Sequence, residues 1–285
     1  MQNVYNNATR MASGTVRSWI IGQARHGQIC FTRRELCAAF PEMGRDTLNT
    51  GLYRACRSRL AAIAWQGFYV ILPPEYQAVG MLPPAEYIGR LMQFLGKPYC
   101  VALLNAAAHY GAAHQRPMNF MVMTSHPMPR STVKRLNRID FISKLEMDNG
   151  IPAELVRTVK TQYGSMLVSS PEFTACSLVQ YTKASGGLSH VVSVLHELMD
   201  ACDFAHLPSV LADFVPAPCL QRLGYIVERV LDNPAAALHL HRFLLSSVPR
   251  LRMTKLVPQL PADQCPVDSR WKIIINRNLN PDSDD

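Results

Sequence analysis

Apolar residues recur every three or four positions between residues 45 and 60, the spacing that buries one face of a helix. The stripe consists of Leu48, Leu52, Ala55 or Cys56, and Leu60. The opposite face of this helix is polar and basic. A tight hairpin follows over residues 60–72 and reverses at Gln66-Gly67. The pattern therefore predicts a helix that presents a polar face, with a two-stranded wing behind it.

Two shorter helices precede the basic helix. An apolar stripe predicts the first from about Thr15 to His26, followed by a glycine at which it would stop. Thr32 and Glu35 have the spacing of a capping box, which predicts the start of the second helix, ending near Phe40. Helix, short helix, turn, basic helix and hairpin is the order of a winged helix-turn-helix. A small helical domain with a solvated basic face is the alternative.

Charge favours the DNA-binding interpretation. The chain of 285 residues has a formal net charge of +8 and a pI of about 9.2. Residues 1–80 contain nine arginines, no lysine and four acidic residues, a net charge of +5 in under a third of the chain. Arginine binds phosphate and guanine in a bidentate manner, and asparagine suits adenine.

We expect the polar face and its flanks to contact DNA. Residues expected in the major groove are Asn49, Thr50, Tyr53, Arg54 and Arg57. Residues expected on phosphates are Arg33, Arg34, Arg45 and Arg59, with Gln66 at the tip of the wing.

The remainder of the chain predicts a larger, mixed domain. Met81 to Pro84 are interpreted as a stiff linker, which gives a winged helix-turn-helix domain at 1–80 and a second domain at 81–285. Strands are predicted at 119–123, 138–142, around 159–168 and at 271–275. Helices are predicted at about 85–95, 101–110, 170–181, 188–199, 206–213, 218–231 and 234–246. The predicted fold class is α+β.

Basic residues in the second part form either a solvated rim or a second anion-binding surface. The residues of this second basic surface are Arg116, Lys134, Arg135, Arg138 and Lys144. Eight scattered cysteines without a CxxC pair exclude a zinc ribbon, and neither a signal peptide nor an apolar run of about 18 residues is seen. We therefore expect a reduced, cytoplasmic protein that does not bind a membrane.

The sequence contains no complete catalytic constellation. Asp140 and Lys144 resemble part of a metal-dependent nuclease, but the second acid before the lysine is missing, and Glu146 falls after it. The pairs His109/His114 and His239/His241 do not have a spacing that converges on one metal. We expect no enzyme activity, no cofactor and no metal. A nuclease or a ligand-sensing regulator remains the alternative.

Several sequence segments resemble the AbiEi family of antitoxins and occur in the same order as in that family. They cover residues of about 13–230, and the most specific is Ala113-His114-Gln115-Arg116-Pro117. The others include Gly67–Tyr76, Ala106–Ala112, Arg138-Ile139-Asp140-Phe141, Ser170-Pro171-Glu172, Gly186-Gly187-Leu188 and Leu220–Tyr225. Ser177 departs from the family, because relatives are expected to carry an acid there.

The resemblance implies a two-domain antitoxin of a type IV toxin–antitoxin system, of the kind that acts in abortive infection and phage defence. Its winged helix would bind inverted repeats in its own promoter and repress the operon. Its second domain would counter a nucleotidyltransferase-like AbiEii toxin, without forming a stable complex.

Overall fold

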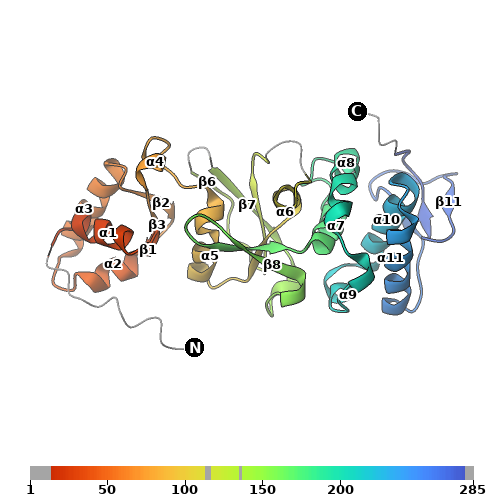
Figure 1. The fold of residues 1–285 in the computed structure, drawn as a ribbon, viewed down its shortest axis with the longest axis horizontal. Helices are drawn as coiled ribbons and strands as arrows, with labels where there is room; N and C mark the ends of the chain where they lie inside the picture. Colours follow the sequence, from red (N-terminus) through yellow and green to blue (C-terminus); the bar gives the residue numbers. More distant parts are fainter. Residues whose placement is uncertain (1–13, 113–116, 135–136, 280–285) are drawn as a thin grey trace. The chain divides into compact units, whose positions relative to one another are not determined.

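The computed structural model of the chain describes residues 14–112, 117–134 and 137–279 (Figure 1). Contacts within the chain divide it into two compact units. Unit 1 comprises Met1–Pro98, Pro129–Asp140 and Thr158–Met166. Unit 2 comprises Tyr99–Met128, Phe141–Arg157 and Leu167–Asp285. The boundary predicted between residues 80 and 81 stays a prediction of where the folding domains divide.

Unit 1 begins with three helices. α1 (Val16–Arg25) is capped by Thr15, whose hydroxyl accepts a hydrogen bond from a first-turn amide at 3.2 Å. α2 (Arg33–Ala39) and α3 (Arg45–Arg57) follow. The apolar stripe of α3 is buried as predicted, and it consists of Leu48, Leu52 and Ala55.

The capping box predicted for α2 is confirmed. Thr32 Oγ1 accepts a hydrogen bond from the backbone N–H of Glu35 at 3.1 Å. In return, the backbone N–H of Thr32 donates to Glu35 Oε2 at 2.6 Å. Two amides that the helix cannot satisfy are therefore bonded at its first turn.

The wing has three strands rather than the two that the hairpin predicts. β2 (Ala61–Trp65) and β3 (Phe68–Ile71) form the predicted hairpin, and Gly67 at its turn has a φ of +78°. β1 (Cys30–Thr32), which the sequence analysis missed, pairs antiparallel with β3 and gives the order β1-β3-β2. The rings of Phe31 and Tyr69 stack across this pair with their centroids 5.2 Å apart.

The stretch expected to be a stiff linker is packed. Met81 and Leu82 are buried, and Pro83 and Pro84 form the N-cap and first turn of α5 (Pro84–Leu95). A short helix, α4 (Pro74–Gln77), lies between the wing and this stretch. The linker prediction was wrong because the apolar pair at 81–82 has a core to enter.

A mixed sheet of six strands has the order β6-β7-β5-β4-β9-β8. Its strands are β4 (Tyr99–Val101), β5 (Phe120–Thr124), β6 (Thr132–Lys134), β7 (Asn137–Ser143), β8 (Val156–Lys160) and β9 (Ser165–Ser169). β5 and β7 lie where strands were predicted. The single strand expected around 159–168 is two strands, and the turn between them is closed by the Thr161 N–H donating to Gly164 O at 2.9 Å.

Helices supply the largest part of the regular structure of unit 2. They are α6 (Leu103–His109), α7 (Pro171–Gln180), α8 (Leu188–Leu198), α9 (Leu211–Phe214), α10 (Ala217–Tyr225) and α11 (Pro234–Ser247). Single-turn 3-10 helices are η1 (Leu145–Met147), η2 (Ala153–Leu155), η3 (Met199–Ala201) and η4 (Phe204–His206). η5 (Ile226–Val230) continues α10 as a π-helix. Each predicted helix has a counterpart, but 206–213 is reduced to the single turn of α9.

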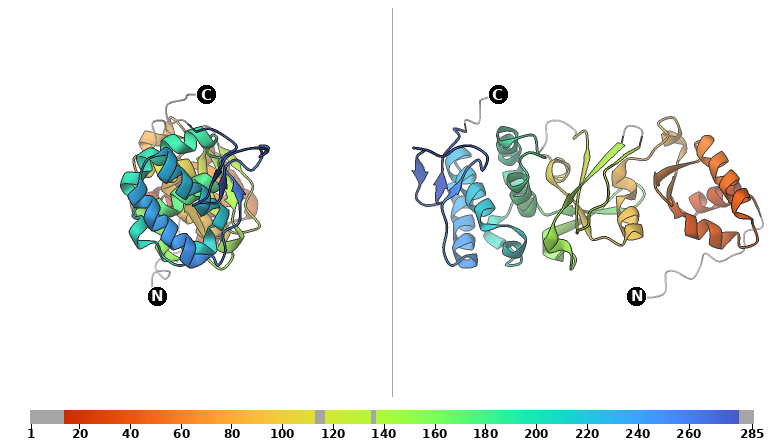
Figure 2. Two further views of the ribbon diagram at one scale, coloured as in Figure 1. Left: turned by 90° about the vertical axis from the view of Figure 1, so that its right-hand side faces the viewer. Right: turned by 180° about the vertical axis from the view of Figure 1, so that it is seen from behind.

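The core of unit 2 centres on α7. Every residue from Pro171 to Val179 is buried except Glu172, and α10 packs against both α7 and α11 (Figure 2). A small sheet of order β10-β12-β11 closes the far end, with strands β10 (Thr254–Lys255), β11 (Val267–Asp268) and β12 (Ile273–Ile274). Trp271 beside it is fully buried, and its indole N–H donates to Glu228 Oε2 at 2.6 Å. The predicted α+β fold class is confirmed.

Candidate nucleic-acid interface

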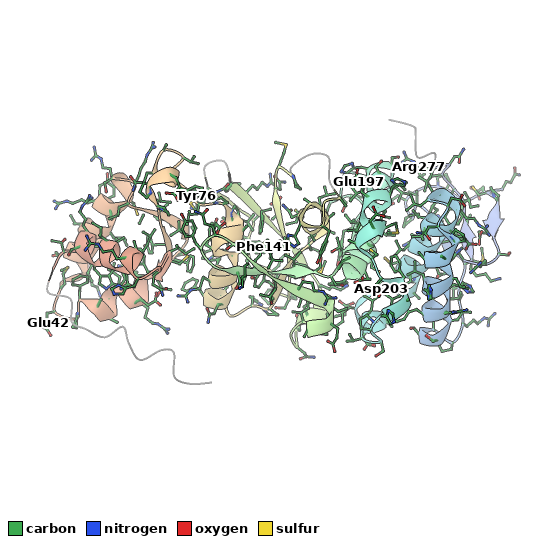
Figure 3. The ribbon with its side chains drawn as sticks, in the orientation of Figure 1. Glu42, Tyr76, Phe141, Glu197, Asp203 and Arg277 are labelled. Carbon is green, nitrogen blue, oxygen red and sulfur yellow. The ribbon has the colours of Figure 1, made fainter. Side chains whose placement is uncertain are left out.

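The outward face of α3 carries the residues expected to read DNA. Asn49, Thr50, Tyr53, Arg54 and Arg57 are all exposed, and Tyr53 keeps 63% of its surface accessible. At 100° per residue these positions cover the side of the helix opposite the buried stripe. An aromatic ring, an amide, a hydroxyl and two guanidinium groups thus share one surface. Glu42, in the turn before α3, is exposed as well (Figure 3).

Arg33 and Asn49 are brought together across two helices. Arg33 Nη2 donates a hydrogen bond to Asn49 Oδ1 at 2.7 Å. Arg33 also lies beside the phenol of Tyr69. Burial raises the pKa of Tyr69, and the charge and hydrogen bond of Arg33 act to lower it. The side chain of Arg33, predicted to bind a phosphate, is therefore engaged within unit 1.

Arg59 is also engaged by its own unit. It adopts a φ of +57°, which turns the chain out of α3. Its Nη1 donates to the carbonyl oxygens of Gln77 at 3.0 Å and Ala78 at 2.6 Å, at the end of α4. A phosphate would have to share or displace these bonds, so the phosphate contact expected of Arg59 stays a prediction.

The remaining residues expected at the DNA are exposed. Arg34 on α2, Arg45 at the first turn of α3 and Gln66 at the wing turn all face solvent. The wing turn is tied to α2, because the backbone N–H of Arg33 donates to Gly67 O at 2.9 Å. Arg17, for which no DNA contact was predicted, donates from Nη1 to Ser58 Oγ at 3.4 Å, just beyond α3. The arginine-only charge of residues 1–80 is the signal that could have identified it.

The second basic surface is only partly described. Arg116 and Arg135 lie outside the described residues. Lys134 is half-buried on β6, and Arg138 on β7 is paired with Asp140 at 2.9 Å. This pairing neutralises part of the expected charge and gives the Asp140 carboxylate a partner.

Lys144 was expected on that surface, and this prediction was wrong. Its side chain is 1% exposed, and Nζ donates to Gln180 Oε1 at 3.3 Å and lies 3.8 Å from Glu146 Oε2. Burial lowers the pKa of Lys144, and the nearby Glu146 carboxylate partly opposes this shift. The amine is thus a buried group with internal partners and does not meet solvent.

Ser177, where an acid was expected in relatives, lies in the centre of α7. It is fully buried, and its hydroxyl has no hydrogen-bond partner among the residues that the structure describes. A carboxylate at this position would enter the core and would need a hydrogen-bond or charge partner there.

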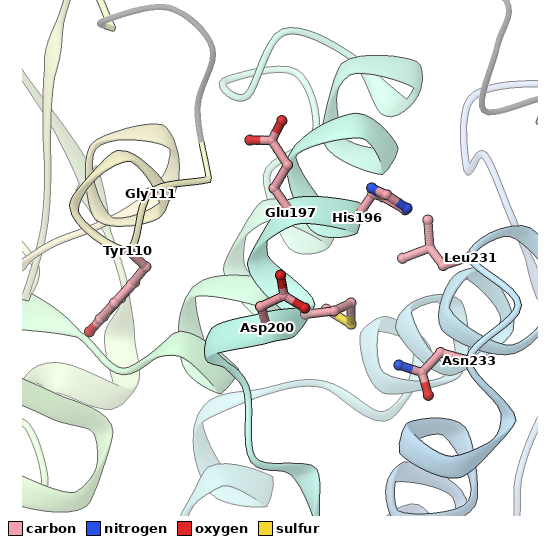
Figure 4. A pocket seen from close by; sticks show the side chains of 8 residues that line it. Tyr110, Gly111, His196, Glu197, Asp200, Leu231 and Asn233 are labelled. Carbon is pink, nitrogen blue, oxygen red and sulfur yellow. The ribbon is translucent and has the colours of Figure 1, made fainter.

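Unit 2 contains a cavity of about 520 Å³ (Figure 4). Its polar lining includes Tyr110, His196, Glu197, Asp200 and Asn233. His196 and Glu197 point in different directions. Across residues 14–112, 117–134 and 137–279, no group of three His, Cys, Asp or Glu side chains could hold a metal ion. In the same residues, no helix has the length and apolar character needed to cross a membrane.

The predicted histidine pairs have other neighbours. His109 contacts the ring of Tyr110 edge-on at 5.1 Å between centroids. His241 contacts the ring of Trp271 at the same distance. His114 lies outside the described residues.

Comparison with known proteins bears on residues 99–229 and on the fold. Residues 99–229 match the family model of the AbiEi antitoxin C-terminal domain, which confirms the resemblance to AbiEi antitoxins. No curated protein matches the chain. The crystal structure of the RV2827C protein from Mycobacterium tuberculosis is similar, with a TM-score of 0.62 and 16% identity over 90% of this chain and 89% of that one. At this identity the likeness concerns the fold alone.

Proposed function

We propose that this protein, a member of the AbiEi antitoxin family through residues 99–229, is a DNA-binding antitoxin that represses its own operon. The observation that carries the DNA-binding part is the exposed face of α3. Side chains that can donate to base edges and phosphates are gathered there, opposite a buried apolar stripe.

Docking follows the logic of a winged helix. α3 enters the major groove, where Tyr53, Arg54 and Arg57 meet base edges. Arg34 and Arg45 bind phosphates on either side, and Gln66 brings the wing to the backbone. Two copies of the site on inverted repeats in the promoter would give negative autoregulation.

The antitoxin part belongs to a type IV system of abortive infection. The functional partner is a nucleotidyltransferase-like AbiEii toxin, which the protein counters in the cytoplasm without a stable complex. It does so without catalysis of its own, and no metal or other cofactor takes part. Two contacts argue against the nuclease alternative, which needs Asp140 and Lys144 together: Asp140 is paired with Arg138, and Lys144 is buried beside Gln180.

One variant tests both parts in the full chain. Arg54→Ala with Arg57→Ala removes two guanidinium groups from the exposed face, and we expect it to abolish the shift of the native promoter fragment. Arg242→Ala with Arg250→Ala removes the same charge from exposed positions of unit 2 and serves as the matched control. Unchanged promoter binding by the α3 variant would refute the DNA-binding assignment.

The same α3 variant, expressed from an independent promoter, should still rescue cells from the co-encoded toxin. Rescue without repression would separate the two activities. A wild-type chain that represses its operon but does not rescue cells would instead favour a ligand-sensing regulator. The cavity in unit 2 would then be the ligand site.

A further inference from the structure

The contact between Arg33 and Asn49 fixes how Asn49 faces its surroundings. The two residues are 16 positions apart and lie on α2 and α3, with Arg33 Nη2 and Asn49 Oδ1 2.7 Å from each other. A guanidinium group only donates hydrogen bonds, and the only acceptor of an asparagine amide is Oδ1. The oxygen must therefore face Arg33, and the Nδ2 hydrogens are directed elsewhere.

Arg33 itself is held between the wing and the helices. Its backbone N–H donates to Gly67 O at 2.9 Å, and the preceding residue, Thr32, pairs with Phe68 of β3. Its side chain lies beside the phenol of Tyr69. Because the wing, α2 and α3 all meet at this side chain, its position is set before any DNA arrives.

We propose that Arg33 is a positioning residue that makes Asn49 a donor-only reader of a base edge. This inference rests on the proposed DNA-binding function. A free asparagine reads adenine in a bidentate manner, donating to N7 and accepting from the N6 amino group. The amide oxygen has two lone pairs: Arg33 takes one and places its positive charge beside the other. A second hydrogen bond from a base amino group is therefore disfavoured, which leaves Nδ2 as the group that reads the DNA. N7 is an acceptor in adenine and in guanine, so the contacted position tolerates either purine.

Analogues of the operator bases test this proposal. Asn49→Ala identifies the contacted position. It is the purine whose 7-deaza analogue weakens DNA binding by the wild-type chain but does not weaken binding by this variant. At that position we expect loss of N7 to weaken wild-type binding about tenfold, and loss of the 6-amino group of adenine to have no effect. In Arg33→Met the amide is released, so adenine becomes preferred and removal of its amino group now weakens binding.

Arg34→Met is the matched control, because Arg34 is the next residue of α2 and is exposed. As a phosphate contact it should weaken binding to all sequences alike. The proposal is overturned if Arg33→Met behaves in the same way, with an unchanged base profile and a shallower dependence on salt. That result would return Arg33 to the phosphate role expected from the sequence.

A measurement without DNA separates this proposal from the function on which it rests. The side-chain amide signals of Asn49 in a ¹H–¹⁵N spectrum should move in Arg33→Met and stay in place in Arg34→Met. Signals that do not move in either variant would overturn the contact. Failure of the wild-type chain to prefer its promoter over scrambled DNA would refute the DNA-binding function, whichever way the amide signals respond.

Discussion

At the scale of single residues, burial and pairing decide which charged groups are available to a partner. Exposed guanidinium groups such as Arg54 are accessible to a ligand, whereas Arg59 directs Nη1 at two carbonyl oxygens. Lys144 is the extreme case, because its amine is buried beside Gln180 and Glu146. Its charged form loses hydration on folding, and its pKa is lowered.

The stability of the protein should reflect this buried lysine. Its pKa is lower in the folded chain than the ordinary value of 10.5, so between the two values the unfolded chain binds more protons. Stability from this group therefore increases as the pH rises towards 10.5 and is absent below the folded pKa. We expect the difference in unfolding free energy between wild type and Lys144→Met to shift in favour of wild type over this window. Denaturation at a series of pH values measures it, and a difference independent of pH would contradict it.

The positions of Lys144 and of the Arg33–Asn49 pair could not be predicted from the sequence pattern. Alternation along β7 buries Ile139 and Phe141, so the continued pattern places Lys144 outward. The strand ends at Ser143, however, and the chain turns Lys144 inward. The contact between Arg33 and Asn49 joins two helices and depends on their crossing, which periodicity does not encode.

At the scale of elements, close approach of α1 and α3 holds the reading helix. A Cβ on Gly51 of α3 would lie 2.7 Å from Val16 Cγ2 of α1, whereas a Cβ on Gly22 of α1 meets nothing within 4 Å. Both glycines are helical and neither has a positive φ. The two positions therefore form a matched pair that differs in the space available.

We expect opposite effects from alanine at these two glycines. Gly22→Ala should stabilise the chain by roughly 0.5–1 kcal/mol, the usual gain of helix propensity. Gly51→Ala gains the same propensity but must displace Val16, which costs about 1–3 kcal/mol, so a net loss is expected. Thermal unfolding monitored by circular dichroism measures both changes. The double variant, Gly51→Ala with Val16→Ala, should lose less stability than the sum of the two single changes. Strict additivity would argue against the clash.

Elements with local signals were predicted, and those that depend on distant partners were not. The capping box at Thr32 and the Ser-Pro-Glu start of α7 are encoded within four residues, and both are confirmed. β1 and β4 are three residues each, too short to show alternation, and they are strands because β3 pairs with β1 and because β5 and β9 pair with β4. The exposed face of α3 was predictable for the same local reason as its buried stripe.

At the scale of the whole molecule, the question is whether the total net charge or individual arginines that contact phosphates drive the binding of DNA. The formal charge of +8 attracts any polyanion. A contact to phosphate is different, because it releases counterions. Each such contact makes the negative slope of log affinity against log salt steeper by about 0.9. Arg34→Ala with Arg45→Ala and Arg242→Ala with Arg250→Ala remove the same charge from the chain. We expect the first pair of substitutions to make this slope shallower by the equivalent of roughly two phosphate contacts. The second pair should leave the slope unchanged. Equal changes in the two slopes would mean that the total charge, rather than the surface around α3, holds the DNA.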